Sequence, residues 1–483
     1  MDRTAQLTAR PTQRELVYDP PPTKPSLHLR AVRVLEDNWT GTNTVPSRSL
    51  YPHQWSWDSA FIAIGLRHIS PLRAQTELET LLDAQWGDGR IPHIVFNPSV
   101  PLDAYFPSPD FWRSSTAGRA AGAPRTVQTS GIVQPPVHAL AAWLVHRADP
   151  GLSRARGFLS RVYPRLAAWH RYLLHRRDLG GGSLASVVHP WEQGMDNSPC
   201  WDAPLSRITP ASARSFRRAD LDHGAAEDRP TDLDYGRYVR LATDYRDGGY
   251  QDGGGRFAVE DPAFNALLIA SEHALARIAH ELGATGTARH ARAERLTAAL
   301  VERLWDPAAG MFFCRDVRDG TTDGATGGAA SGALIPERSV SGLIPLLLPT
   351  LPREIATALV RTLHGPHFGG GTRLVPSYDL LGEAFDPHRY WRGPAWFNTS
   401  WLVERGLRAH GESARADALR AAVLDTADTS DFAEYVDPYT GEACGATGFS
   451  WTAALTLDLL DSDTSAGDTS VTAIAAIKGG DRA

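Results

Sequence analysis

The chain has 483 residues, 42% of them hydrophobic, and its 49 basic and 55 acidic residues give a net charge of −6. A chain of this length can bury a large core in one or two domains. The near balance of charge excludes the basic surface that nucleic-acid binding requires. No apolar run approaches the roughly 18 residues of a membrane-spanning helix. We therefore expect neither a nucleic-acid partner nor a membrane partner.

The two ends of the chain differ in composition from the rest. Residues 1–28 are rich in proline and lack the apolar core of a secretory signal, and residues 462–483 are small and polar. These features predict a partly disordered N-terminal extension, a flexible C-terminal tail and a cytoplasmic location. The three cysteines, Cys200, Cys314 and Cys444, have no CxxC spacing. They argue against a disulfide framework and against a structural zinc site.

Between the ends, apolar residues recur three and four positions apart, which indicates amphipathic helices. The predicted helices span residues 30–39, 57–69, 71–85, 136–148, 155–177, 232–247, 262–282, 286–305, 338–348, 352–364, 394–410, 412–427 and 450–461. Alternating strands are scarce. About a dozen helices with long connections predict an all-α fold, an (α/α)6 toroid of helical hairpins over residues 29–461, with a two-domain helical protein as the alternative. The segments 86–135 and 178–231 are too long for simple links, so we expect them to form a cap.

The first motif is YPHQWSWD at residues 51–58, directly before the apolar run SAFIAIGL. Asp58 lies where a helix N-cap is expected, so simple capping is one interpretation. Tyr51, Trp55 and Trp57 crowd the same helix start. Because sugar rings stack their C–H faces on aromatic rings, the motif also fits a sugar-binding rim in which Asp58 accepts hydrogen bonds from hydroxyl groups.

The second motif is HPWEQGMDNSPCWD at residues 189–202. Its acidic residues Glu192 and Asp196 lie four positions apart between two tryptophans. Apolar surroundings raise the pKa of a carboxyl group and keep it protonated near neutral pH, as a general acid requires. The segment is therefore a candidate for acid catalysis, although the residues alone do not choose between the two carboxyl groups.

Two further motifs precede helices in the C-terminal third. The segment YWRGPAWFN at residues 390–398 places Pro394 at an expected first-turn position. Residues 433–442, AEYVDPYTGE, hold several competing carboxylates, Glu434, Asp437 and Glu442, and are followed by FSWT at residues 449–452.

Taken in this order, the motifs WxWDSAFxxxG, WExGMDNSPxWD, YWRGPxWxN and EYxxPxTG…FSWT resemble glycoside hydrolase family 63 over about residues 45–461. The resemblance implies an (α/α)6 barrel with a cap and inverting α-glycosidase activity. It assigns the general acid to Asp196 and the general base to Glu434, with Glu192 as a supporting residue of the substrate site.

Within the family, the bacterial glucosylglycerate and mannosylglycerate hydrolases are the most similar branch. Their RPTDxDYxRY element is present at residues 229–238, and it implies that Arg229 and Tyr235 hold the glycerate. A guanidinium group suits this role because it binds a carboxylate through two hydrogen bonds. The same segment also reads as a helix start with Thr231 as N-cap, and both interpretations can hold at once.

The expected function is hydrolysis of glucosylglycerate to glucose and glycerate, without a metal or organic cofactor. Mannosylglycerate and a neutral α-glucoside are alternative substrates, and a non-catalytic carbohydrate-binding protein is a remote alternative. The expected partner is the small glycoside itself, and a homo-oligomer is possible. The predicted substrate site comprises Tyr51, Trp55, Trp57, Asp58, Gln134, Glu192, Arg229, Tyr235, Tyr390, Trp391, Gly393 and Trp396.

Overall fold

The computed structural model describes residues 25–221, 226–319 and 332–461. The predicted tail, and the predicted extension up to residue 24, lie outside these ranges. Helix α1 (Leu27–Asp37) begins within the last residues assigned to the extension. The Ser26 hydroxyl caps it by accepting a hydrogen bond from the backbone N–H of Leu29.

An inner ring of helices forms the centre of the molecule. Its members lie in chain order around the ring, each contacts the next, and the last contacts the first. They are α2 (Ser56–Leu66), α6 (His138–Ala148), α12 (Pro262–Glu281), the consecutive 3₁₀ helices η6 (Val340–Gly342) and η7 (Ile344–Leu347), α15 (Phe397–Ala409) and α17 (Ser450–Asp461). Every residue of α2 is buried, which is the pattern of a helix surrounded by others.

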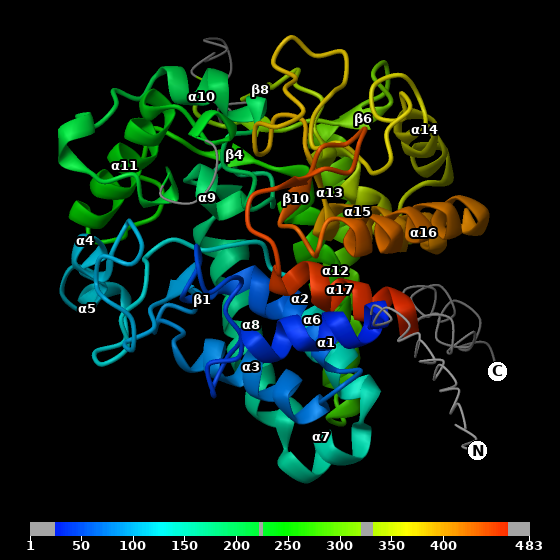
Figure 1. The fold of residues 1–483 in the computed structure, drawn as a ribbon. Helices are drawn as coiled ribbons and strands as arrows, with labels where there is room; N and C mark the ends of the chain where they lie inside the picture. Colours follow the sequence, from blue (N-terminus) through cyan, green and yellow to red (C-terminus); the bar gives the residue numbers. More distant parts are fainter. Residues whose placement is uncertain (1–24, 222–225, 320–331, 462–483) are drawn as a thin grey trace, which may run out of the picture.

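An outer layer of helices surrounds this ring (Figure 1). It consists of α1, α3 (Pro71–Asp83), α8 (Phe158–Arg176), α13 (Thr287–Leu304), α14 (Arg353–Leu363) and α16 (Ser413–Thr429). These helices bury one face only. In α14, for example, Ile355, Leu359 and Leu363 are buried and Arg361 is not. The predicted (α/α)6 toroid is thereby confirmed.

Three predicted helices differ from the observed ones. Residues 338–348 form 3₁₀ turns, because Pro345 has no N–H to donate to an α-helical bond. The helix predicted over 155–177 is interrupted by Gly157, whose left-handed φ of +60° separates α7 (Pro150–Arg156) from α8. Helix α15 begins at Phe397, so Pro394 is not in its first turn.

Two-residue strands brace the starts of the inner helices. Strand β1 (Gln54–Trp55) precedes α2 and pairs with β2 (Ile94–Val95). Strand β9 (Ala395–Trp396) precedes α15 and pairs with β10 (Tyr435–Val436), which also pairs with β11 (Ala443–Cys444). The remaining antiparallel ladders join β3 (Ser186–Val187), β4 (Val259–Glu260), β7 (Arg315–Asp316) and β8 (Ala333–Leu334), and β5 (Trp305–Asp306) with β6 (Met311–Phe312).

The long connections gather on one side of the ring (Figure 1). Their short helices are α4 (Pro109–Trp112), α5 (Ser114–Ala117), η1 (Arg119–Ala121), α9 (Pro190–Gln193), η2 (Pro199–Trp201), α10 (Asp202–Ser206), η3 (Ala213–Ser215), η4 (Ala219–Leu221) and η5 (Ala226–Asp228), beside α11 (Asp232–Asp247).

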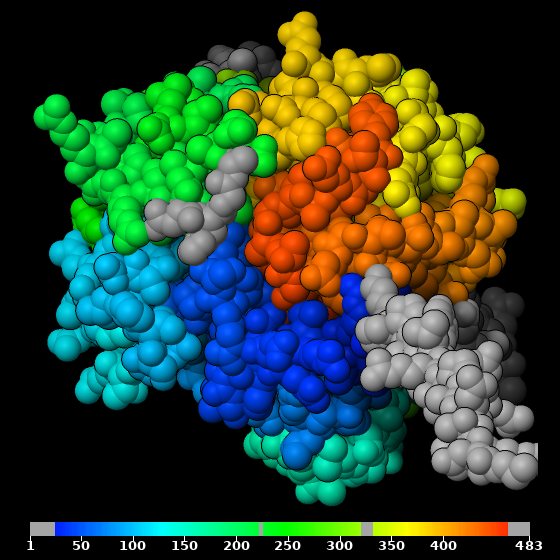
Figure 2. Space-filling view, in the orientation of Figure 1, coloured from blue at the N-terminus to red at the C-terminus, as the bar shows by residue number. Residues whose placement is uncertain are grey.

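The two connections meet in an aromatic contact between Phe106 and Phe216, whose ring centroids are 6.4 Å apart. Figure 2 shows the cyan and green residues of these connections abutting the blue N-terminal residues on the same face as the orange-red C-terminal ones. None of the helices in the described ranges is long and apolar enough to cross a membrane.

Candidate active site

A pocket lies at the end of the ring where α2, α15 and α17 begin. It is lined mainly by aromatic and carboxyl side chains contributed by several motifs and by the connections at 86–135 and 178–231. The lining residues are Pro46, Tyr51, Trp55, Trp57, Asp58, His93, Tyr105, Gln134, Trp191, Gly194, Asp196, Tyr390, Trp391, Trp396, Glu434, Phe449 and Trp451.

Most of the residues singled out in the sequence meet in this pocket. Those that line it are Tyr51, Trp55, Trp57, Asp58, Gln134, Asp196, Tyr390, Trp391, Trp396 and Glu434. Four others, Glu192, Arg229, Tyr235 and Gly393, are not among the lining residues. Tyr51 and Glu434, which are 383 positions apart in the chain, converge because the ring brings the first and last helices together.

Asp58 lies in the first turn of α2, but it is not the N-cap. The N-cap residue is Trp55, whose extended backbone continues strand β1, so the capping interpretation of Asp58 is wrong. The Asp58 side chain is instead buried in the pocket wall. Burial raises the pKa of its carboxyl group well above the usual value, and nearby Glu434 adds to the rise. A protonated carboxyl can both donate to and accept from a sugar hydroxyl.

The aromatic wall is held together by ring-to-ring contacts. Trp391 and Trp396 stack with centroids 3.8 Å apart, and Tyr435 stacks on the other side of Trp396 at 4.5 Å. Across the pocket, Tyr51 meets Trp55 edge to face at 5.2 Å. Such packing fixes the rings in place, so the wall is a preformed apolar surface for a sugar ring.

The backbone around Asp196 is fixed from three directions. The Tyr238 hydroxyl donates to the Asp196 carbonyl at 2.8 Å, and the Trp201 indole N–H donates to the Met195 carbonyl at 2.7 Å. The Asn197 side-chain oxygen accepts from the backbone N–H of Trp391 at 2.9 Å. These bonds connect the segment around Asp196 to helix α11, to Trp201 of the same motif and to the 390–398 motif.

Gly194, two residues before Asp196, allows the motif to pass close to the pocket wall. Its φ is +84°, and a Cβ at this position would lie 2.6 Å from the ring of Trp57. A side chain would therefore strain the backbone and collide with the wall. Glycine is required here so that Asp196 can face the pocket.

The Asp196 carboxyl group is suited to hold a proton. Among the described residues, no other residue forms a hydrogen bond with this carboxyl group. Burial raises its pKa to about 7, although the charge of Arg229 opposes the rise. The group is therefore partly protonated near neutral pH and can donate a proton.

The Glu434 carboxylate has different surroundings. It accepts a hydrogen bond from the Tyr51 hydroxyl at 2.9 Å and one from the backbone N–H of Ala446 at 3.2 Å, and Arg229 Nη2 lies 3.6 Å away. Burial raises the pKa of Glu434, whereas these three donors lower it by favouring the ionised form. The two carboxyl groups in the pocket thus differ in their surroundings. That of Asp196 makes no hydrogen bond to another described residue, whereas that of Glu434 is surrounded by donors.

Arg229 is buried behind this wall, with 5% of its surface exposed. It donates to the Tyr51 hydroxyl at 3.1 Å, and its guanidinium lies 4.8 Å from the ring centroid of Tyr390. Its Nη2 atom has no hydrogen-bond partner among the described residues. Because Tyr51, Tyr390 and Glu434 all line the pocket, Arg229 supplies a positive charge at its edge.

The other three predicted residues lie outside the lining. Tyr235 donates to the Phe106 carbonyl at 3.0 Å in the 86–135 connection. Gly393 donates through its backbone to the Ser377 hydroxyl at 3.1 Å. Glu192 is fully buried and forms an ion pair at 2.6 Å with Arg177, so its carboxylate faces the protein interior.

Several lining residues were not selected from the sequence. Phe449 and Trp451 belong to the last motif, and Trp191 belongs to the acid motif, so their motif membership was the available signal. Tyr105 and His93 lie in irregular loops between residues 86 and 135, where no periodicity marks them. Burial lowers the pKa of His93 to about 3, so this side chain is neutral in the pocket.

A helical toroid with two unlike carboxyl groups in an aromatic pocket has the features of a glycoside hydrolase. A protein-family model described as "Mannosylglycerate hydrolase MGH1-like glycoside hydrolase domain" matches residues 51–452. The chain is 41% identical to the mannosylglycerate hydrolase of Rubrobacter radiotolerans, over 91% of this chain and 98% of the relative. It is 39% identical to the glucosylglycerate hydrolase of Mycolicibacterium hassiacum, over 92% and 99%.

A solved structure is also similar. The glycoside hydrolase family 63 mannosylglycerate hydrolase of Thermus thermophilus, in complex with Tris and D-glycerate, has a TM-score of 0.79 and 38% identity. The match covers 90% of this chain and 100% of that one. This chain therefore belongs to glycoside hydrolase family 63, in its mannosylglycerate hydrolase MGH1-like group, and is a glycoside hydrolase.

Proposed function

We propose that the protein hydrolyses glucosylglycerate to glucose and glycerate by a single displacement. The observation that carries the proposal is the buried positive charge of Arg229 beside two unlike carboxyl groups. The glycerate carboxylate needs a cationic partner once it leaves water. The Arg229 guanidinium offers one, because its Nη2 makes no hydrogen bond to the described residues and lies 3.6 Å from Glu434. The names of the relatives point to the same aglycone.

In the proposed mechanism, Asp196 donates its proton to the glycosidic oxygen as the bond to the anomeric carbon breaks. Glu434, ionised and held by Tyr51, accepts a proton from a water molecule that attacks the anomeric carbon from the opposite face. After the step Asp196 is ionised and Glu434 is protonated. Exchange of one proton with solvent at each group restores the starting state, so no net proton is gained or lost. In this mechanism, protein side chains carry out both proton transfers. The cytoplasmic location and the homo-oligomer remain predictions from the sequence.

Mannosylglycerate is the second candidate substrate, favoured by the 41% identical relative that carries this name. Glucose and mannose differ only in the orientation of the 2-hydroxyl. A screen against glucosylglycerate, mannosylglycerate, trehalose and kojibiose tests both candidates. We expect one glycerate glycoside to exceed the neutral disaccharides in kcat/KM by about 10- to 100-fold, because a charge-assisted hydrogen bond contributes about 1.5–3 kcal/mol. Faster hydrolysis of trehalose or kojibiose would contradict the assignment of glycerate.

The stereochemistry of the product provides a separate prediction. Attack by water from the face opposite the leaving group inverts the anomeric centre. Proton NMR during the first turnovers of an α-glycoside should therefore show the β-anomer of the sugar before mutarotation. Initial appearance of the α-anomer would instead require a covalent intermediate and would exclude the proposed single displacement.

A further inference from the structure

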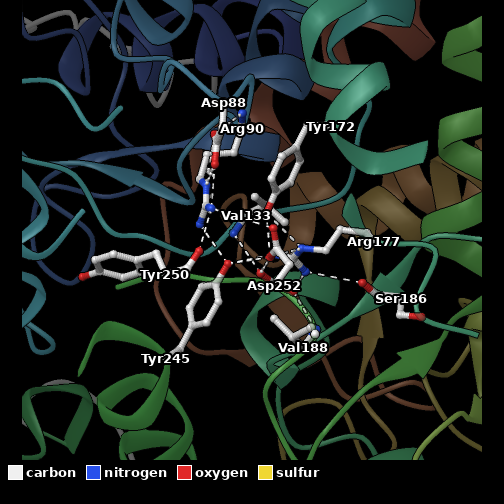
Figure 3. Close-up of polar contacts among 12 residues, drawn as sticks. Asp88, Arg90, Val133, Tyr172, Arg177, Ser186, Val188, Tyr245, Tyr250 and Asp252 are labelled. Atoms are coloured by element: carbon white, nitrogen blue, oxygen red, sulfur yellow. Dashed lines mark hydrogen bonds and ion pairs between the residues drawn. The ribbon is translucent and has the colours of Figure 1, made fainter. Parts of the chain in front are cut away.

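A largely buried network of charged and phenolic side chains surrounds Arg177 (Figure 3). Arg177, the residue that ends helix α8, forms ion pairs with Glu192 at 2.6 Å and with Asp252 at 2.8 Å. Arg177 and Glu192 have no exposed surface. Figure 3 shows Arg177, Asp252 and the two tyrosines Tyr172 and Tyr245 pointing toward one another. None of these residues lines the pocket, so the network has no direct access to a bound sugar.

The Glu192 carboxylate is the point at which separate parts of the chain meet. Both of its oxygens accept from the Arg177 guanidinium, at 2.6 and 2.7 Å. One oxygen also accepts from the backbone N–H of Val133 at 3.2 Å, and the other from that of Val188 at 2.7 Å. One carboxylate thus joins the end of α8, the 86–135 connection and the residues that lead into helix α9.

Two of the three joined segments carry a residue of the pocket. Val133 is followed by Gln134, whose side-chain oxygen accepts from the backbone N–H of Trp57 at 3.1 Å. Glu192 itself precedes Asp196 by four residues, within the short helix and turn that present the acid. The network therefore fixes the acid motif and one pocket wall relative to the same helix.

Arg90 extends the connection on the far side of Asp252. It lies 3.9 Å from the Asp252 carboxylate and donates to the Gly131 carbonyl at 2.8 Å. The Tyr245 hydroxyl donates to Asp252 at 2.7 Å and accepts from Arg90 at 2.8 Å. The chain segment around Gly131 and Val133 thus has two attachments. Arg90 bonds the Gly131 carbonyl directly, and Arg177 holds the Val133 N–H through Glu192.

An ion pair of its own would not suit the general acid Asp196, because a cation in direct contact would lower the pKa of its carboxyl group and leave it ionised. Its carboxyl group has no hydrogen-bond partner among the described residues, and its position depends on the backbone of its motif. We propose that Glu192, paired with Arg177, is a positioning residue for Asp196. This inference rests on the proposed role of Asp196 as proton donor and adds a residue that acts through it.

The variant Glu192→Gln tests the proposal. The amide has the size of the carboxylate but only one acceptor oxygen, so it cannot accept from both backbone N–H groups and Arg177. We expect kcat on the glycerate glycoside to fall by about 10- to 100-fold, the effect of displacing a catalytic group by roughly 1 Å. On the matching α-glycosyl fluoride, whose leaving group needs little protonation, kcat should change by less than about threefold.

A matched control separates positioning from general destabilisation. Glu272 on α12 is equally buried and bonds His170 at 2.6 Å and Arg289 at 3.0 Å, outside the pocket lining. Glu272→Gln should lower the melting temperature as Glu192→Gln does, yet leave the ratio of kcat values on the two substrates unchanged. Arg177→Lys, which keeps the charge but loses the paired hydrogen bonds, should reproduce the selective loss if Glu192→Gln does not fold.

The positioning role would be overturned if kcat fell equally on the glycerate glycoside and the α-glycosyl fluoride. It would also be overturned if the ratio of these two kcat values stayed at the wild-type value in both Glu192→Gln and Arg177→Lys. Either result would leave the proposed function intact. A separate experiment with Asp196→Asn tests the proposed function itself. If Asp196→Asn shows no selective loss on the glycerate glycoside, Asp196 is not the proton donor, and the inference falls with it.

Discussion

Asp196→Asn and Glu434→Gln should each reduce kcat on the glycerate glycoside by at least about 10³-fold, within the range of general acid–base catalysis. Neither change removes volume from the pocket. The Asp196 carboxyl group makes no hydrogen bond to another described residue, and a glutamine at position 434 can still accept from Tyr51. Asp196→Asn should therefore keep the wild-type melting temperature, whereas Glu434→Gln should lower it, because it removes the negative charge 3.6 Å from the buried Arg229. Steady-state kinetics beside a thermal melt measures the two quantities.

The two variants should differ on an α-glycosyl fluoride. Asp196→Asn should regain much of the wild-type rate, because fluoride departs with little help from an acid. Glu434→Gln should remain inactive on both substrates, because water still has to lose a proton. The reverse pattern would exchange the two roles, and near-normal rates in either variant would remove that residue from the mechanism.

Asp437 provides a control from the same motif as Glu434. It is buried, but its carboxylate accepts from the backbone N–H groups of Tyr439 and Thr440, both at 2.8 Å, and so shapes a turn. Asp437→Asn should leave kcat and KM near their wild-type values. The sequence left Asp437 and Glu442 as competitors of Glu434, and this comparison separates Asp437 from Glu434 experimentally.

The helices could be predicted closely because the two layers of the toroid leave different patterns. Outer helices such as α14 bury one face and show spacings of three and four, whereas α2 is buried throughout and apolar over its last seven residues. The failures have local causes. Pro345 removes a hydrogen-bond donor from the ring element at 344–347, and Gly157 adopts a left-handed conformation that a periodic pattern does not reveal.

The pocket could be predicted in part because its residues cluster in motifs at the starts of inner helices, as Trp57 and Asp58 do at α2. The place of Glu192 could not be predicted in this way. Its partners Arg177 and Val133 lie 15 and 59 residues away, and only the folded ring brings them together. His93 was missed because a single histidine in a loop carries no pattern.

Arg229→Ala should reduce kcat/KM on the glycerate glycoside by about 30-fold to several thousand-fold, since truncating one partner of a buried charge pair costs about 2–5 kcal/mol. Arg229 donates to the Tyr51 hydroxyl, and its Nη2, which forms an ion pair with Glu434 at 3.6 Å, is also the atom proposed to bind the glycerate. A neutral aryl glycoside should therefore also lose activity, but less, because only its catalytic base is disturbed. Equal losses on the two substrates would remove the reason for assigning glycerate.

The pH dependence gives the same variant a second readout. Hydrolysis needs Glu434 ionised and Asp196 protonated, so activity falls below the pKa of Glu434 and above that of Asp196, about 7 in the free protein. The charge of Arg229 lowers both pKa values. Without it both rise, and the whole bell-shaped profile of kcat/KM on the neutral substrate should move to higher pH.

Arg229→Lys separates the two contributions of this residue. A lysine keeps the positive charge, so the pH profile should stay near that of the wild type. It cannot, however, form the two parallel hydrogen bonds through which a guanidinium binds a carboxylate. The KM for the glycerate glycoside should therefore rise while the neutral substrate is little affected. A profile that shifts in Arg229→Lys as far as in Arg229→Ala would show that position, rather than charge, links Arg229 to the catalytic pair.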